Sequence, residues 1–256
     1  MTETGTQGAP SPPRLLEFDL STPDGNLRGM LAIPPGPMRL AELARSTLPL
    51  VDRLVELATR REQRAGRVIS CGPGCGACCR QLAPVSPPEA YMLADLLMHV
   101  PAERQGRYLE RFEAAASRLE AEGLSEALLR TPESDEAARA LAARYFLLGI
   151  PCPFLEEESC SVHGGRPSVC REYLVTSPAA DCADPAANPI RRVGVSVRLS
   201  EALARLHAEL FGGEPQLVPL SLAISFALEH IPEGRHAWDG VALTRRLLAL
   251  MSGAQA

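Results

Sequence analysis

The chain has 256 residues, of which 46% are hydrophobic and only 4% aromatic, and its formal net charge at pH 7 is −5. All 26 basic residues are arginine, which removes Schiff-base chemistry on lysine and argues against the lysine-dependent P-loop. The arginines are scattered, so the clustered basic face of a nucleic-acid-binding protein is absent. A core of leucine, alanine and valine points to helices.

Residues 1–13 are polar and contain prolines, without a charged segment followed by an apolar stretch. They are predicted to be a disordered tail and not a secretory signal. No apolar run approaches the ~20 residues of a membrane span. The sequence thus predicts a cytoplasmic protein that does not cross a membrane. In a reducing compartment, thiols are expected to serve as metal ligands more often than to form disulfides.

A β-hairpin and a long helix are predicted for residues 14–68. Asp24-Gly25 separates two apolar runs, which is typical of a hairpin turn. From Leu40 to Arg61 the apolar residues recur at three- and four-residue steps, which indicates a helix. Pro49 is expected to open the main part of this helix, because an internal proline removes a hydrogen bond.

Residues 69–190 are predicted to form a cysteine-cluster metal-binding domain. Ser86 and Glu89 have the spacing of a capping box, which marks the start of a helix. The second cysteine region, 152–189, is rich in Pro, Gly, Ser and Asp and should be mostly loop. Helical periodicity predicts helices over residues 87–99, 102–121 and 133–148.

The C-terminal part, residues 191–256, is predicted to pack on that domain. A short strand is expected near 191–198, followed by three helices with leucine-rich stripes. Gly212 should end the first of these helices, and Asp239 should cap the last. The expected fold is mainly α, with a small N-terminal β-hairpin and a cysteine-rich loop region forming a metal site. The hairpin and the C-terminal helices should pack around that site or form a surface for a protein partner.

Four thiols lie within nine residues in the pattern C-x3-C-x2-C-C. Two cysteines separated by two residues can turn back so that both sulfurs meet one ion at about 2.3 Å, the usual zinc–sulfur distance. Gly72, Gly74 and Gly76 are expected to allow backbone angles closed to other residues. Because consecutive side chains diverge, Cys78 and Cys79 either serve two metals or a cluster, or one of them packs beside the site.

Four more thiols follow in the pattern C-x7-C-x9-C-x11-C, whose intervals are too wide for a metal-binding knuckle. The fold must place each of them, so that they complete a site nucleated by the first cluster. Thiolates are soft ligands, which favours zinc, iron or an iron–sulfur cluster without separating the three. The predicted ligands of the metal ion are Cys71, Cys75, Cys78, Cys79, Cys152, Cys160, Cys170 and Cys182.

The motifs follow one another in a specific order, from Cys75-Gly-Ala-Cys78-Cys79-Arg80 to Cys152-Pro-Phe-Leu, Arg166-Pro167 and Cys170-Arg171-Glu-Tyr173. This order resembles the YkgJ-like cysteine-cluster proteins. That family is described as zinc- or iron-chelating, and its relatives include flagellin lysine N-methylases. The resemblance covers about residues 71–182. It implies a cysteine-ligated zinc or iron site and leaves open whether the protein is an enzyme.

His163 departs from the family pattern, which usually has an aromatic residue at this point. It is interpreted either as the replacement of a packing tyrosine or as a further ligand at C-x2-H spacing. Arg166 and Arg171 are expected either to donate hydrogen bonds to cluster sulfurs or to brace the loop through backbone carbonyls. Tyr173 is expected to pack in the interior.

Two other functions are consistent with parts of the sequence. A protein-lysine N-methyltransferase would need a site for S-adenosylmethionine, but the usual glycine-rich turn is not visible, and Gly212-Gly213 ends a helix. A thiol redox protein would use Cys75 and Cys78 as an exchanging pair, with six other thiols competing.

Overall fold

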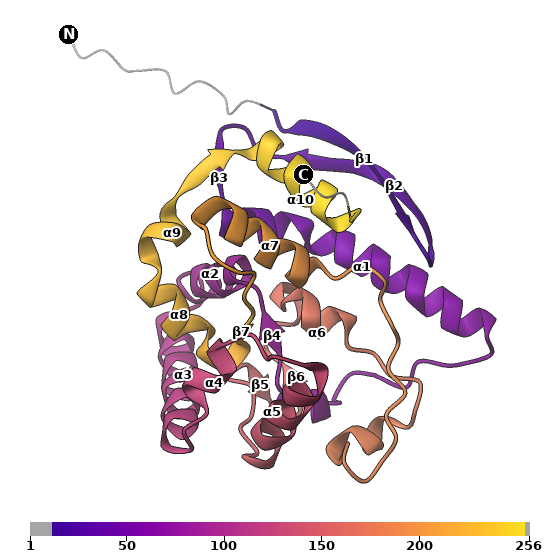
Figure 1. Ribbon diagram of the computed structural model, residues 1–256, viewed down its shortest axis with the longest axis vertical. Helices are drawn as coiled ribbons and strands as arrows, with labels where there is room; N and C mark the ends of the chain where they lie inside the picture. The colour runs from indigo at the N-terminus through magenta and orange to yellow at the C-terminus, as the bar shows by residue number, and fades with distance from the viewer. Residues whose placement is uncertain (1–11, 254–256) are drawn as a thin grey trace.

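A computed structural model describes residues 12–253, and within them ten α-helices dominate (Figure 1). The strands of this part form four small sheets, each of two antiparallel strands. The predicted mainly α fold with an N-terminal hairpin is therefore confirmed. Most of the predicted tail, residues 1–11, lies outside the described residues. None of the helices in residues 12–253 combines the length and the apolar character that crossing a membrane would take.

The hairpin consists of β1 (Arg14–Thr22) and β2 (Gly25–Ile33), joined at the predicted turn. Alternate side chains of β1 are buried, as expected for a sheet with one face on the core. Both strands contact α10 (Gly240–Met251), which lies beside the hairpin in Figure 1. The last helix thus covers the first structural unit of the chain.

Pro49 lies inside α1 (Leu40–Arg64), a continuous helix of 25 residues, so the expectation that it opens the main part of the helix is wrong. Pro49 itself is exposed, whereas Leu43 and Val51 on either side of it are buried in the same core. Burial of this continuous apolar stripe outweighs the cost of an internal proline, about 3 kcal/mol.

Helix α2 (Pro87–Leu97) is central, because it contacts α1, α7 (Leu199–Phe211) and α8 (Ala223–Glu229). Its first seven residues are all buried, as expected for a helix covered on every side. The predicted capping box of Ser86 and Glu89 is present. This start fixes where the chain leaves the first cysteine cluster and enters the core.

Three helices follow α2 along the chain: α3 (Ala102–Ala121), α4 (Ser125–Leu129) and α5 (Asp135–Leu147). The structure confirms the predicted helices at α3 and α5, while the sequence pattern missed α4. Tyr108 and Phe112 of α3 meet the ring of Phe154 edge to face, with centroids 5.0 and 5.3 Å apart. Phe154 belongs to the Cys152-Pro-Phe-Leu motif, so α3 anchors the start of the second cysteine region.

The C-terminal part contains α7, α8, α9 (Ile231–Arg235) and α10. Gly212 ends α7 with a φ of 85°, and the Asp239 side chain accepts a hydrogen bond from Ala242 N at 2.8 Å, both as predicted. The predicted strand at 191–198 is wrong, because its only ladder contact in the described part is an isolated bridge between Val175 and Arg192. A partner strand long enough to extend this bridge is missing, so the backbone stays irregular.

The remaining sheets are short connections between distant segments. They pair β3 (Pro37–Arg39) with β8 (Ala237–Asp239), β4 (Pro84–Val85) with β7 (Val218–Pro219), and β5 (Leu155–Glu156) with β6 (Ser159–Cys160). One hydrophobic core contains residues of the hairpin, the central helices and the C-terminal helices. The division of the chain at residues 13, 68 and 190 stays a prediction.

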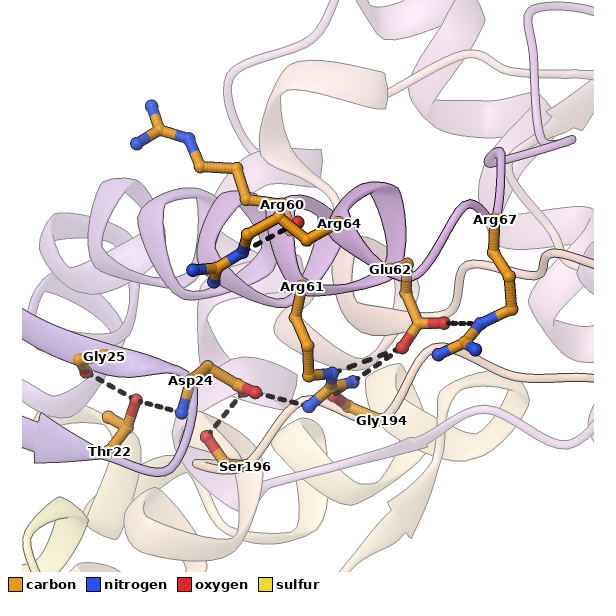
Figure 2. A network of polar contacts seen from close by, with 10 residues as sticks. All are labelled: Thr22, Asp24, Gly25, Arg60, Arg61, Glu62, Arg64, Arg67, Gly194 and Ser196. Atoms are coloured by element: carbon orange, nitrogen blue, oxygen red, sulfur yellow. Dashed lines mark hydrogen bonds and ion pairs between the residues drawn. The ribbon is translucent and has the colours of Figure 1, made fainter.

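Figure 2 shows how the end of α1 is tied to the hairpin turn and to the segment 194–196. The Arg61 guanidinium pairs with Asp24 and donates to the Gly194 carbonyl at 2.8 Å. Asp24 in turn accepts from Ser196 Oγ at 2.9 Å. Glu62 pairs with Arg67, the residue through which the chain leaves the helix toward the first cysteine. This network positions the entrance to the cysteine region.

Candidate metal centre

The first cysteine cluster follows the end of α1 in an irregular segment. Cys71 and Cys75 lie in the loop, whereas Cys78 and Cys79 lie in η1 (Ala77–Arg80), a single 3₁₀ turn. Among the three glycines of the cluster, only Gly74 has a positive φ, 81°. The expectation that all three glycines need special backbone angles is therefore wrong for Gly72 and Gly76.

The later thiols are placed by four short segments. Cys152 precedes β5, and Cys160 lies in β6. Cys170 lies in α6 (Ser168–Glu172), and Cys182 lies in η3 (Ala179–Ala183). All eight cysteines are free thiols, and only Cys182 is fully buried. The region is mostly loop, as predicted, although the sequence pattern missed α6.

Hydrogen bonds join the two cysteine regions at their backbones. Cys152 N donates to the Cys79 carbonyl at 2.7 Å. Gln81 Nε2 donates to the Cys182 carbonyl at 3.3 Å, and η1 packs against η3. Regions far apart in the sequence therefore lie side by side.

A further contact reaches a sulfur atom directly. Val175 N donates to Cys71 Sγ at 3.4 Å, while the Val175 carbonyl accepts from Ser70 N at 3.0 Å. Backbone N–H groups directed at sulfur are common around metal thiolates, because they stabilise the negative charge of the ligand. The segment after α6 is thus fixed against the first cluster at Ser70 and at Cys71.

Gly76 is needed for the close approach of the β5–β6 hairpin. A Cβ atom built on Gly76 would lie 2.5 Å from Glu158 Oε2 and 2.9 Å from Leu155 Cδ1. Glu157 and Glu158 form the tip of this hairpin with φ values of 48° and 56°, which are uncommon for residues other than glycine. Arg80 holds the tip through two bonds to Glu158, at 2.5 and 2.9 Å.

Glu89 positions the helix that carries Cys170. Its carboxylate is fully buried and accepts hydrogen bonds at both oxygens. Oε2 accepts from Ser86 N and Oγ at 2.9 and 2.8 Å, and Oε1 accepts from Ser168 N and Oγ at 2.7 and 2.6 Å. One carboxylate therefore caps α2 and fixes the start of α6. The sequence signalled only the first of these roles.

The thiols lie close enough to influence one another's pKa. Burial raises the pKa of Cys182. Three neighbouring thiols raise it further, namely Cys71, Cys75 and Cys78. Burial raises the pKa of Cys170 well above its ordinary value. Three other thiols raise it further, namely Cys152, Cys160 and again Cys78. We call Cys71, Cys75 and Cys182 the first thiol set, and Cys152, Cys160 and Cys170 the second thiol set. The doublet consists of Cys78 and Cys79, and Cys78 influences the pKa of thiols in both sets.

Burial dominates the protonation of these thiols. At Cys152 burial raises the pKa to about 12, although the backbone N–H of Phe154 opposes the rise. At Cys78 the hydrogen bond with Cys79 is the largest cause of a raised pKa, and burial follows. Such thiols are neutral at pH 7 in the absence of a cation. A metal ion that binds here must therefore displace protons.

The two arginines of the second region differ in role. Arg171 braces the loop, because its Nε donates to the Arg166 carbonyl at 3.0 Å and its guanidinium also pairs with Asp52 at 2.7 Å. Arg166 has a buried Nε without a hydrogen-bond partner among residues 12–253. Its charge lowers the pKa of Cys160, against the larger effect of burial. An unpaired N–H beside sulfur fits a group that would accept a hydrogen bond from it.

The structure does not choose between the two interpretations of His163, and it places Tyr173 beside an arginine. The pKa of His163 is lowered, mainly by the charge of Arg166 and then by burial and Arg171. A neutral imidazole is compatible with either interpretation of this residue. The Tyr173 ring is partly buried and lies under the Arg192 guanidinium, 4.9 Å from its centroid.

In the side-chain arrangement described for residues 12–253, no three His, Cys, Asp or Glu residues form a group that could already hold a metal ion. The backbone brings the thiols together, and closing a coordination shell would take rotations about side-chain bonds. Such rotations are compatible with the donor set, because cysteine has a single χ angle with three staggered positions. Soft thiols, a nearby N–H on sulfur and an unpaired Arg166 Nε together fit zinc or iron.

Comparison with known proteins gave one match. Residues 70–188 match the family model CxxCxxCC, described as a "putative zinc- or iron-chelating domain". A search of curated proteins and a search of solved structures each found nothing similar. The matched residues contain all eight cysteines and every motif on which the resemblance was based. Residues 70–188 are therefore a cysteine-cluster domain of the CxxCxxCC family.

Proposed function

We propose that residues 70–188 hold zinc or iron through cysteine thiolates. The observation that supports this most is the position of Cys78. Its thiol is close enough to both thiol sets for their pKa values to be coupled, although these sets come from segments far apart in the sequence. Packing alone gives no reason for so many thiols to gather in a region of loops.

The grouping of the thiols favours two coordination sets. The first and second thiol sets contain three residues each, and Cys78 of the doublet is close enough to both to influence their pKa values. Each cysteine of the doublet would complete a different set of four once the two side chains turn out of the hydrogen bond that joins them. Four thiolates are the full ligand set of a structural zinc ion or of an iron–sulfur cluster. The protein would then hold up to two centres.

The electrostatics of the region support ligation by thiolate. Burial raises the pKa of thiols in both sets, so thiolates would be costly here without a compensating cation. A divalent ion supplies that charge and stabilises the deprotonated form. The Arg166 Nε would donate to a sulfur and offset the remaining negative charge. A zinc ion would contribute folding energy, whereas an iron–sulfur cluster would also allow one-electron transfer.

Metal analysis of protein purified without oxygen tests the proposal. Bound zinc or iron is expected at one to two centres per chain, with visible charge-transfer absorption only in the case of iron–sulfur. Cys78→Ser should lose at least half of the metal. Gly72→Ala is the matched control in the same loop, because a Cβ at Gly72 meets no atom within 4 Å. Metal-free protein with eight titratable thiols would rule the proposal out.

Paired variants test the division into two sets. If it is correct, Cys71→Ser with Cys182→Ser should remove one centre and leave the other, and Cys152→Ser with Cys170→Ser should do the converse. Complete metal loss in both pairs would instead indicate a single shared centre. The two outcomes differ in metal content measured on folded protein, so circular dichroism should accompany the measurement.

A further inference from the structure

A cavity of about 390 Å³ lies between α1, α2 and the loop before α6. Both α2 and α6 pack against α1 near the middle of the molecule (Figure 1). The volume falls at the lower end of the range for small-molecule sites, about 300–1,000 Å³. None of the thiols lines this cavity, and its contents are not implied by metal binding.

The walls of the cavity are mostly apolar. Leu48 and Pro49 of α1 face Met92 and Leu96 of α2 across it. Both Leu48 and Met92 belong to the buried core, so this wall is rigid. The exposed proline that interrupts the hydrogen bonds of α1 is part of the same wall. Such walls favour a ligand with an apolar body.

The charged groups that line the cavity have an excess of positive charge. They are Arg45, Arg171 and Asp52, which is two guanidinium groups against one carboxylate. Arg171 is buried and already paired with Asp52 through NH1. Its Nε and NH2 each donate to a loop carbonyl, which leaves one of its five N–H donors unused.

Arg45 is the uncompensated charge in the lining of the cavity. It is exposed, and none of the hydrogen bonds and ion pairs found within residues 12–253 includes its side chain. The protein as a whole has a net charge of −5, so a local excess of one positive charge is not a general property of its surface. A single negative group beside Arg45 would neutralise it.

The glycine pair of the loop shapes the cavity. A Cβ atom built on Gly165 would lie 2.8 Å from Leu96 Cδ1, so any larger residue here would have to displace the Leu96 side chain. A Cβ on Gly164 meets no atom within 4 Å, and Gly164 has no positive φ. Beside Gly164 there is therefore open space that a larger residue could fill.

We propose that this cavity binds a small organic anion, a monocarboxylate with an apolar body. The carboxylate would meet Arg45, and the apolar body would lie between Leu48 and Leu96. The proposal goes beyond the metal site and does not depend on it, because none of these residues is a thiol of either set.

Calorimetric titration of the full chain, as purified without oxygen, with octanoate tests the proposal. Acetate carries the charge without the apolar body, and octanol carries the body without the charge. Octanoate is expected to bind more tightly than either. The proposal fails if octanoate does not bind, or if octanol binds as well as octanoate does.

Two variants locate the site. Arg45→Glu should weaken octanoate binding about fivefold or more, because an attraction becomes a repulsion. The matched control is Arg139→Glu, the same charge change at an exposed position of α5, which should bind as the wild type does. Gly164→Leu should block the cavity. Unchanged affinity in both Arg45→Glu and Gly164→Leu, in protein with wild-type circular dichroism and metal content, would overturn the assignment.

Discussion

The central helices and the cysteine region reach their positions by different means. Around α2, long helices bury continuous apolar stripes, and residues such as Leu203 and Leu247 are completely buried. In the cysteine region the segments have two to five residues of regular structure, and seven of the eight thiols are only partly buried. Hydrogen bonds between single residues, such as that from Cys152 N to the Cys79 carbonyl, hold these segments together.

This difference predicts two kinds of stability in one chain. Burial of apolar area is spread over many side chains, so the helical core should be stable by itself. The cysteine region has little such area, and each of its contacts is worth about 1 kcal/mol. We therefore expect its order to depend on the metal that we propose.

Removal of the metal should separate the two regions most clearly. Chelation of anaerobically purified protein is expected to cost several kcal/mol or more of folding free energy, because ligation contributes directly to folding. Hydrogen exchange should increase in residues 70–80 and 152–182, while α2 and α10 keep their protection. Equal loss of protection in all four segments would show that the helical core does not stand by itself.

Truncation of the core should give the converse result. Leu247 of α10 is 0% exposed, whereas Leu147 at the end of α5 is 81% exposed. Leu247→Ala is expected to destabilise the chain by about 2–5 kcal/mol through the lost burial and the cavity left behind. Leu147→Ala should lie within about 0.5 kcal/mol of the wild type. Urea unfolding measures both, and metal content should stay the same in each.

Crowding the contact between the first cluster and the β5–β6 hairpin should affect the cysteine region alone. Gly76→Ala places a methyl group against Glu158 and Leu155, which is expected to cost about 1–3 kcal/mol. Gly72→Ala, four residues earlier, should be close to neutral. Reduced metal retention in Gly76→Ala but not in Gly72→Ala would support the role of this contact; equal retention would count against it.

The smallest effect is expected at the connection between the two regions. Hydrogen bonding to Arg67, and then to Arg61, lowers the pKa of Glu62 below its ordinary value. A lowered pKa in the folded state stabilises the protein above the unfolded value of about 4.3, and this contribution is lost as the pH falls through the folded value.

Wild-type protein should therefore lose more stability between about pH 6 and about pH 3 than Glu62→Gln does. Urea unfolding at the two pH values measures this difference. Glu113→Gln, at an exposed position of α3, is the control and should follow the wild type. If Glu62→Gln and the wild type lose equal stability, the pairing with Arg67 does not contribute to it.

Most of the helical architecture could be predicted, because its signals are local. Three- and four-residue steps of apolar residues indicate the helices, and Ser86 with Glu89 marks the start of α2. The expectation that Pro49 opens the main part of the helix was wrong for a physical reason. The cost of a proline inside a helix is local, whereas the burial that outweighs this cost depends on the whole core. The strand expected at 191–198 failed similarly, since a strand needs a partner that local alternation cannot guarantee.

The sequence by itself determined which residues could be proposed as metal ligands, since thiol chemistry and the order of the motifs are written in the chain. Only the tertiary structure decided how these thiols are grouped around Cys78, because each of the later cysteines is placed by contacts with distant segments. It also decided the second role of Glu89, the brace made by Arg171 and the cavity beside Arg45. Those features depend on side chains from different elements meeting in space, and no local pattern encodes such meetings.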